Sequence, residues 1–136
     1  MERNTEKKSP EKGSVKTVLI VEDEELMLRL LERYFSRRGY RVLVASDGEQ
    51  AIEIYRRDQP RIDAVLLDMR LPKSTGEEVF RVMKDENPAI KVIMASGFLD
   101  PEVRTAMALA GAKRFVNKPY NLDELLKTFQ SVIDND

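Results

Sequence analysis

The sequence contains neither cysteine nor histidine. Without cysteine, disulfide bonds and thiolate metal sites are excluded. Without histidine, the chain lacks the side chain that most often serves as general base and transition-metal ligand. Any metal ion must therefore be held by oxygen atoms, which favours Mg²⁺ or a similar hard cation.

The chain also lacks an excess of either charge and any long apolar run. Its 136 residues include 23 Lys and Arg and 24 Asp and Glu, a formal net charge of -1. This balance gives no reason to expect nucleic-acid binding. No apolar run is long enough to cross a bilayer, and none follows the charged N-terminus as a signal peptide requires. We therefore expect a soluble, cytoplasmic protein without a direct membrane partner.

Residues 1–14 are almost free of apolar side chains. Such a segment cannot bury enough surface to offset its ordering entropy. The composition predicts a flexible charged tail over 1–14 and one domain over 15–136, a length that suits a single core.

Short apolar runs alternate with amphipathic segments along the rest of the chain. The apolar runs predict strands at 15–21, 41–45, 62–67, 89–95 and 114–117. The amphipathic segments predict helices at 26–38, 49–58, 77–85, 101–110 and 122–133. This strict alternation indicates βαβ units, and therefore an α/β fold with a doubly wound parallel sheet.

Local signals mark the ends and faces of these helices. Gly39 is placed as a C′ glycine, Asp100 as an N-cap before a proline, and Asn121 as the cap of the last helix. Helical spacing groups apolar residues of the first three helices: Met27, Leu30, Leu31 and Tyr34; Ala51, Ile52 and Tyr55; Val79, Val82 and Met83.

Polar side chains with complementary chemistry end four of the predicted strands. In chain order these side chains are Glu22 and Asp23, then Asp68, Ser96 and Lys118. We expect them to meet, because parallel strands share one carboxyl edge, where doubly wound sheets bind ligands. Three carboxylates together would repel one another and raise at least one pKa, and a divalent cation would remove that repulsion.

This group of side chains suits phosphoryl transfer. Asp68 is a carboxylate that can attack phosphorus without a histidine base and form an aspartyl-phosphate. Lys118 offers a compact charge for phosphate oxygens, and Ser96 offers a hydroxyl for a phosphoryl oxygen. Taken singly, each residue also has an ordinary explanation as a helix-start carboxylate, a turn residue or a surface lysine.

Four segments together make the chain resemble the receiver domain of two-component response regulators. They read VLIVEDE, LLDMRLPKSTG, VIMASG and FVNKPY, and the likeness spans roughly residues 15–133. The resemblance implies a flavodoxin-like (βα)5 fold with strand order 2-1-3-4-5. It also implies a peptide bond before Pro119 that is often cis.

The resemblance further implies specific roles for the site residues. Asp68 would be the phosphoacceptor, and Mg²⁺ would be bound by Glu22, Asp23, Asp68 and the backbone carbonyl of Arg70. Lys118 would pair with the phosphoryl group. A histidine kinase or phosphotransfer protein would supply phosphohistidine. The chain would then catalyse its own phosphorylation and slow dephosphorylation, without turning over small molecules.

Ser96 and Phe115 occupy the switch positions of this family. Phosphorylation would draw Ser96 inward, Phe115 would follow, and the face of the fourth helix, fifth strand and fifth helix would change for a downstream protein. Phe115 can also be read simply as a core aromatic residue. Arg70 and Phe98 lie where the family tunes dephosphorylation, and a cation and a bulky ring there predict a long-lived phosphoryl group.

Two other readings compete with this one. The first is a pseudo-receiver that binds partners without phosphorylation, and the intact set of site residues disfavours it. The second is a Mg²⁺-dependent phosphatase on a related fold, disfavoured because no separate acid/base residue or cap insertion is seen. No helix-turn-helix follows the domain, so we expect neither DNA reading nor an output domain. Both a free-standing receiver and one excised from a hybrid kinase fit the sequence.

Overall fold

A computed structural model describes residues 15–98 and 100–135 of the chain. Within these ranges the strands are β1 (Thr17–Val21), β2 (Arg41–Ala45), β3 (Ala64–Asp68), β4 (Val92–Ser96) and β5 (Arg114–Asn117). The helices of the same ranges are α1 (Glu25–Ser36), α2 (Gly48–Asp58), α3 (Gly76–Glu86), α4 (Pro101–Leu109) and α5 (Leu122–Asn135), with a 3-10 turn η1 (Gln59–Arg61) after α2. The predicted tail, residues 1–14, lies outside the described residues.

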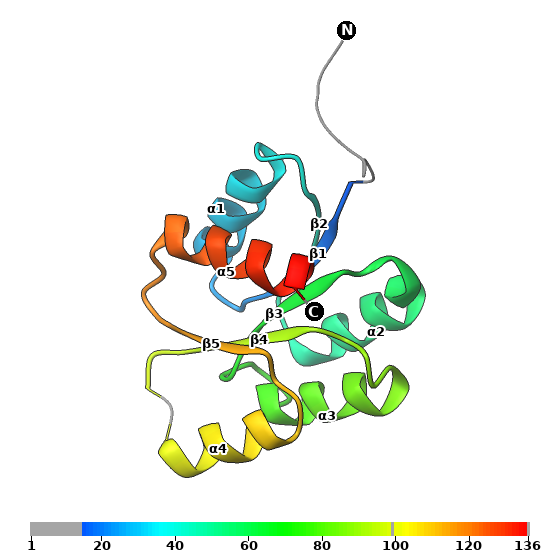
Figure 1. Cartoon of the computed structure of the whole chain (residues 1–136), viewed down its shortest axis with the longest axis vertical. Helices are drawn as coiled ribbons and strands as arrows, with labels where there is room; N and C mark the ends of the chain where they lie inside the picture. The colour runs from blue at the N-terminus through cyan, green and yellow to red at the C-terminus, as the bar shows by residue number, and fades with distance from the viewer. Residues whose placement is uncertain (1–14, 99, 136) are drawn as a thin grey trace, which may run out of the picture.

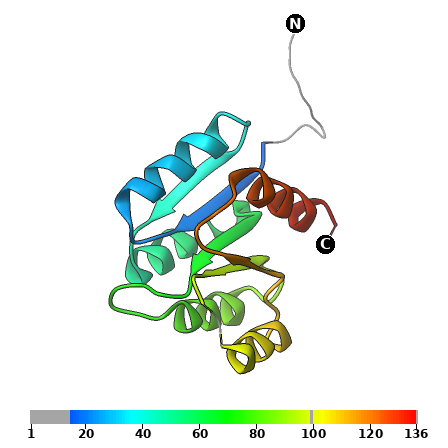
Figure 2. The same ribbon diagram turned by 90° about the vertical axis from the view of Figure 1, so that its left-hand side faces the viewer.

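The strands form one parallel sheet in the order β2-β1-β3-β4-β5. The α/β class, the alternation of strands and helices and the strand order implied by the resemblance are therefore confirmed. Helices α1 and α5 cover one face of the sheet, and α2, α3 and α4 cover the other (Figures 1 and 2). Among the described residues, no helix has the length and apolar character that crossing a membrane demands.

Two apolar cores explain why the central strands read as continuous apolar runs. Leu19 and Val21 of β1 point into the core under α2 and α3, whereas Val18 and Ile20 point into the core under α1 and α5. Every residue of β1, β3 and β4 is buried. A strand buried on both faces has no polar face, so its sequence does not alternate.

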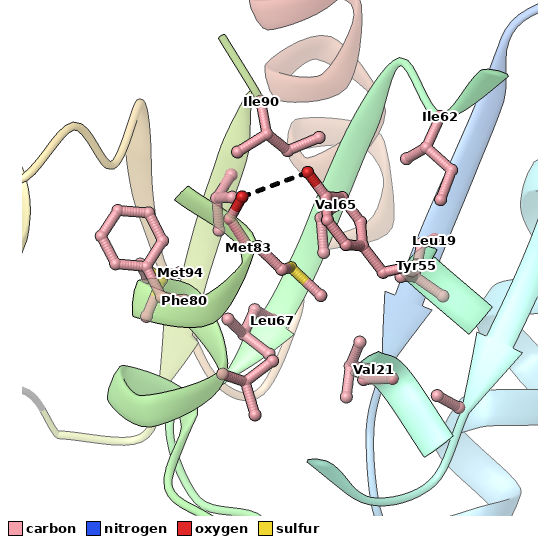
Figure 3. Packing of buried hydrophobic residues seen from close by; sticks show 14 of the residues in the cluster. Leu19, Val21, Tyr55, Ile62, Val65, Leu67, Phe80, Met83, Ile90 and Met94 are labelled. Atoms are coloured by element: carbon pink, nitrogen blue, oxygen red, sulfur yellow. Dashed lines mark hydrogen bonds between the residues drawn. The ribbon is translucent and has the colours of Figure 1, made fainter. Parts of the chain in front are cut away.

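The core under α2 and α3 contains one buried polar side chain whose hydrogen bond is satisfied. The hydroxyl of Tyr55 donates to the backbone oxygen of Met83 at 3.2 Å, which joins α2 to α3 inside the core (Figure 3). On the opposite face, the rings of Phe35 and Phe129 meet edge to face with centroids 4.9 Å apart and join α1 to α5.

The three capping residues predicted from the sequence are confirmed, although several helix bounds differ from the prediction by one or two residues. Gly39 has a φ of +92°, its N–H donates to Ser36, and the next N–H donates to Phe35, the bond pair of a Schellman C-terminus. The side chains of Asp100 and Asn121 accept backbone N–H groups of α4 and α5. A reciprocal capping box between Thr75 and Glu78, which the sequence analysis did not anticipate, begins α3.

Three strands begin two or three residues later than predicted, and β3 and β4 each end one residue later. β1 begins at Thr17 and not at residue 15; Val15 is exposed, and the pairing of β1 with β2 starts at Thr17. β3 begins at Ala64 and not at residue 62, because Ile62 caps η1 and its N–H is bonded to the backbone oxygen of Gln59. β4 begins at Val92 and not at residue 89, because Asn87 accepts the N–H groups of Ala89 and Ile90 and holds them in a turn.

In two helices, the residues that are buried differ in part from the apolar sets that helical spacing groups. α1 buries Leu28, Leu31 and Phe35, whereas Leu30 remains 47% exposed. In α3, Phe80 is buried and Val82 is only half-buried. Both helices carry more apolar residues than one stripe holds, so only contact with the sheet decides which of them turn inward.

Gly76 permits the close approach of α3 to the end of β3. A Cβ at this position would overlap the backbone oxygen of Asp68 and lie 2.7 Å from Cα of Met69. We predict that Gly76→Ala lowers the free energy of unfolding by roughly 1–3 kcal/mol, the cost of overpacking a rigid contact. Gly97→Ala is the control, because a Cβ there meets no atom within 4 Å. Urea denaturation of both variants tests this, and equal losses would contradict it.

Candidate functional site

The candidate site lies at the carboxyl edge of the sheet. Asp68 and Ser96 are the last residues of β3 and β4, whereas Glu22 follows β1 and Lys118 follows β5. The parallel register places Asp68 opposite Ala95, and Ser96 opposite Asn117. The carboxyl ends of these neighbouring strands therefore bring all four side chains to one edge of the sheet, as the sequence predicts.

Three carboxylates meet at this edge. Oxygen atoms of Glu22, Asp23 and Asp68 lie within 4.8 Å of one another. Glu22 and Asp68 are buried, with 0% and 2% exposure, whereas Asp23 is exposed to solvent. This all-oxygen donor set, open on one side, fits a hard divalent cation such as Mg²⁺.

Lys118 connects the two buried carboxylates. Its Nζ lies 2.9 Å from Oδ2 of Asp68 and 3.1 Å from Oε1 of Glu22. Burial lowers the pKa of Lys118, but the hydrogen bonds to Asp68 and Glu22 outweigh it and leave that pKa above its usual value. The ammonium is therefore fixed as a cation between two anions.

The pKa of Glu22 is raised above its usual value. Burial is the largest cause, and the charge of Asp68 adds to it. The backbone N–H of Glu24, 3.1 Å from Oε2, and the ammonium of Lys118 oppose the increase. The expected rise in a carboxylate pKa is therefore present, although desolvation contributes more to it than repulsion between carboxylates.

Tyr120 is a member of this cluster that sequence reasoning missed. Its hydroxyl donates to Oε1 of Glu22 at 3.3 Å. Tyr120 lies two residues after Lys118, so its place in the same loop was readable from the sequence. The direction of its side chain was not, because the backbone path after Pro119 decides it; the peptide bond before Pro119 is cis, as the resemblance implies.

Ser96 lies at the site edge, but its hydroxyl is bonded to its own loop. Oγ donates to the backbone oxygen of Phe98 at 2.6 Å and accepts the N–H of Phe98 at 3.1 Å. The backbone oxygen of Ser96 accepts the N–H of Lys118 at 3.0 Å. Ser96 thus bonds the start of the β4–α4 loop through its hydroxyl and the loop that carries Lys118 through its backbone oxygen.

Phe115 does not reach the carboxylates. Its half-buried ring packs against the core under α2, α3 and α4, and the guanidinium carbon of Arg104 lies 4.8 Å from its centroid. β5 is an edge strand, and its two central residues, Phe115 and Val116, are only half-buried. The expected switch role of Phe115 stays a prediction.

A hollow of about 440 Å³ opens above Asp68. It is lined by Asp23, Asp68, Arg70, Gly97, Phe98 and Lys118. Arg70 donates its backbone N–H to Oδ1 of Asp68 at 2.9 Å, and the ring of Phe98 is 76% exposed at the rim. The role of the Arg70 carbonyl as a metal ligand stays a prediction. A larger hollow, between α1 and β2, shares only Asp23 with the carboxylate cluster.

Comparison with known proteins identifies a common domain. The family model described as the response regulator receiver domain matches residues 18–130. A cyclic di-GMP phosphodiesterase of Thermotoga maritima is 35% identical over 80% of this chain, and the probable transcriptional regulatory protein TcrX of Mycobacterium tuberculosis is 31% identical over 89%. These alignments cover only 28% and 51% of those two proteins, so the chain spans about half of such relatives or less.

Solved structures agree with the sequence comparison. A response regulator receiver domain protein from Clostridium thermocellum superposes with a TM-score of 0.83 at 26% identity, covering 88% of this chain and 95% of that one. CheY of Borrelia burgdorferi, in a complex with CheX, BeF3 and Mg²⁺, gives a TM-score of 0.81 at 30% identity, covering 86% and 88%.

The central role of Lys118 yields a stability prediction. In Lys118→Met, two buried carboxylates lose their cation, so we predict a free energy of unfolding lower by roughly 3 kcal/mol at pH 7 in the presence of a chelator. Adding Asp68→Asn should recover part of the loss, because one of the two charges is removed.

Urea denaturation followed by circular dichroism measures both variants. Lys127→Met, an exposed lysine on α5, serves as the control and should change stability by less than about 0.5 kcal/mol. A loss in Lys118→Met no larger than in this control would contradict the cation's role.

Proposed function

Because the chain belongs to the response regulator receiver domain family, we propose that it accepts a phosphoryl group from a partner's phosphohistidine onto Asp68. The arrangement of Asp68 carries this proposal. Its carboxylate is buried at the end of β3, with the ammonium of Lys118 at 2.9 Å and two further carboxylates within 4.8 Å. The partner would be a histidine kinase or a phosphotransfer protein.

The proposed step is a direct displacement at phosphorus. A carboxylate oxygen of Asp68 forms a bond to phosphorus, the phosphorus–nitrogen bond of phosphohistidine breaks, and the nitrogen keeps the electron pair. Lys118 is positioned to neutralise charge on the phosphoryl oxygens. Mg²⁺ held by Glu22, Asp23, Asp68 and the Arg70 carbonyl would supply further neutralisation of phosphoryl charge.

Ser96 offers a route from the phosphoryl group to the surface. A phosphoryl oxygen is a stronger acceptor than a peptide carbonyl, so it would attract the hydroxyl proton that now bonds the oxygen of Phe98. The loop that joins β4 to α4 would then lose one of its two bonds to Ser96. We propose that this change, with Phe115 on β5, alters the α4–β5–α5 face for a downstream protein.

The pseudo-receiver is the alternative function. This alternative requires only a surface that binds a partner, and no phosphoryl transfer. Against it stands the contact geometry: a module that bound partners without phosphorylation would gain nothing from burying Glu22 beside Asp68, at a desolvation cost. The chain spans about half of its longer relatives or less. The partner, the cytoplasmic location and the lack of an output domain therefore stay predictions for this chain.

Intact mass after incubation with acetyl phosphate and Mg²⁺ tests the proposal. We predict a gain of one phosphoryl group, about 80 Da, on the wild type. The gain should disappear in Asp68→Ala and on chelation of Mg²⁺, and should persist in Asp85→Ala, which removes an exposed carboxylate of α3. Asp23→Asn should slow the gain without unfolding the chain, because Asp23 is exposed. Bound Mg²⁺ without any gain, from acetyl phosphate or from a phosphohistidine donor, would favour the pseudo-receiver.

The lining of the hollow predicts a slow loss of the phosphoryl group. Arg70 and Phe98 border the space through which water must reach Asp68. The double variant Arg70→Asn, Phe98→Ala should shorten the phosphorylated lifetime on the order of tenfold, because more water reaches the site. Leu109→Ala, which removes an exposed apolar side chain of α4 outside the hollow, is the matched control. Decay of the phosphorylated mass gives the lifetime. Equal lifetimes in the wild type, the double variant and the control would contradict the prediction.

A further inference from the structure

Glu22 is a fully buried carboxylate whose two oxygens are held by three different donors. Oε2 accepts the N–H of Glu24 at 3.1 Å, and both oxygens face Nζ of Lys118 at 3.1 and 3.3 Å. The third donor is the hydroxyl of Tyr120, 3.3 Å from Oε1. A carboxylate with no solvent exposure depends on such donors to keep both its charge and its orientation.

The hold of Lys118 on Glu22 is shared with Asp68. Nζ lies closer to Oδ2 of Asp68, at 2.9 Å, than to either oxygen of Glu22. A phosphoryl group on Asp68 would draw the ammonium further from Glu22, because its charge is larger. Two donors do not depend on Asp68: the N–H of Glu24 and the hydroxyl of Tyr120.

Tyr120 is anchored by the apolar core as well as by the site. Its ring packs against the apolar core under α1 and α5, and Nζ of Lys118 lies 5.8 Å from the ring centroid. Burial, and the negative charges of Glu22 and Asp68, raise the pKa of Tyr120 above its usual value. The ring is therefore held by packing, and the hydroxyl by its hydrogen bond to Glu22.

We propose that Tyr120 is a positioning residue of the metal site, which fixes the Glu22 carboxylate and thereby sets the Mg²⁺ affinity of the Glu22, Asp23 and Asp68 cluster. This inference rests on the proposed function only in its metal-binding part. Groups that orient a metal ligand from behind change metal affinity by about 10–100-fold when removed. Tyr120 acts through Glu22, so it touches neither the ion nor the phosphoryl group.

Calorimetric titration with MgCl2, without any phosphoryl donor, tests the inference. Tyr120→Phe keeps the packed ring and removes only the hydroxyl, and we expect it to weaken Mg²⁺ binding about tenfold. Tyr34→Phe is the matched control, because it removes a hydroxyl bonded to the carboxylate of Asp123 at 3.0 Å, between α1 and α5. Its Mg²⁺ affinity should equal that of the wild type.

A double variant separates positioning from a general structural effect. In a Glu22→Gln background, Tyr120→Phe should no longer change Mg²⁺ affinity, because the group it orients is no longer a carboxylate. Raising Mg²⁺ to saturation should restore the rate of phosphorylation by acetyl phosphate in Tyr120→Phe.

Affinity in Tyr120→Phe within twofold of the wild type, or an equal loss in the Glu22→Gln background, would overturn the inference. Absence of Mg²⁺ binding by the wild type would overturn it together with the metal part of the proposed function. If the wild type binds Mg²⁺ but takes no phosphoryl group, the proposed function fails, and the titrations still decide the role of Tyr120.

Discussion

The ammonium of Lys118, shared between two buried carboxylates, is the interaction on which this structure depends. Glu22 and Asp68 come from different strands and carry like charges into an edge of the sheet with almost no solvent. Neither could stay ionised there at low cost without a cation. Under the proposed function, the same lysine would also neutralise charge on a phosphoryl group, so one contact would both stabilise the resting site and serve the transfer.

The backbone around this contact is packed on both faces of the sheet, whereas the loop that joins β4 to α4 lies at its edge. Gly76 lets α3 begin directly against the end of β3, and the apolar cores fix β1, β3 and β4 from both faces. The β4–α4 connection, in contrast, depends on hydrogen bonds between Ser96 and Phe98. Under the proposed function, a packed base beside a loop held through one hydroxyl is an arrangement in which a local change of charge can alter a distant surface.

Local signals in the sequence were reliable where the physics is local. The continuous apolar runs, the glycine after α1 and the caps at Asp100 and Asn121 correspond to observed features, because each depends on a few neighbouring residues. Two details were predicted wrongly for different reasons. The local turn bonds of Asn87 to Ala89 and Ile90, which the apolar run did not reveal, delay the start of β4. Packing on the sheet, a long-range contact, selects Leu28 over Leu30 on α1. Helical spacing alone cannot distinguish two overlapping apolar stripes.

The sequence by itself determined the α/β class and the residues that reach the carboxyl edge, because strand alternation and parallel pairing leave a side chain little choice of edge. Only the tertiary structure decided how those residues meet. It showed that Lys118 contacts both Glu22 and Asp68, that Ser96 is bonded to its own loop, and that Tyr120 joins the cluster. Such pairings depend on side-chain direction and on distances between segments far apart in the chain, which no local pattern encodes.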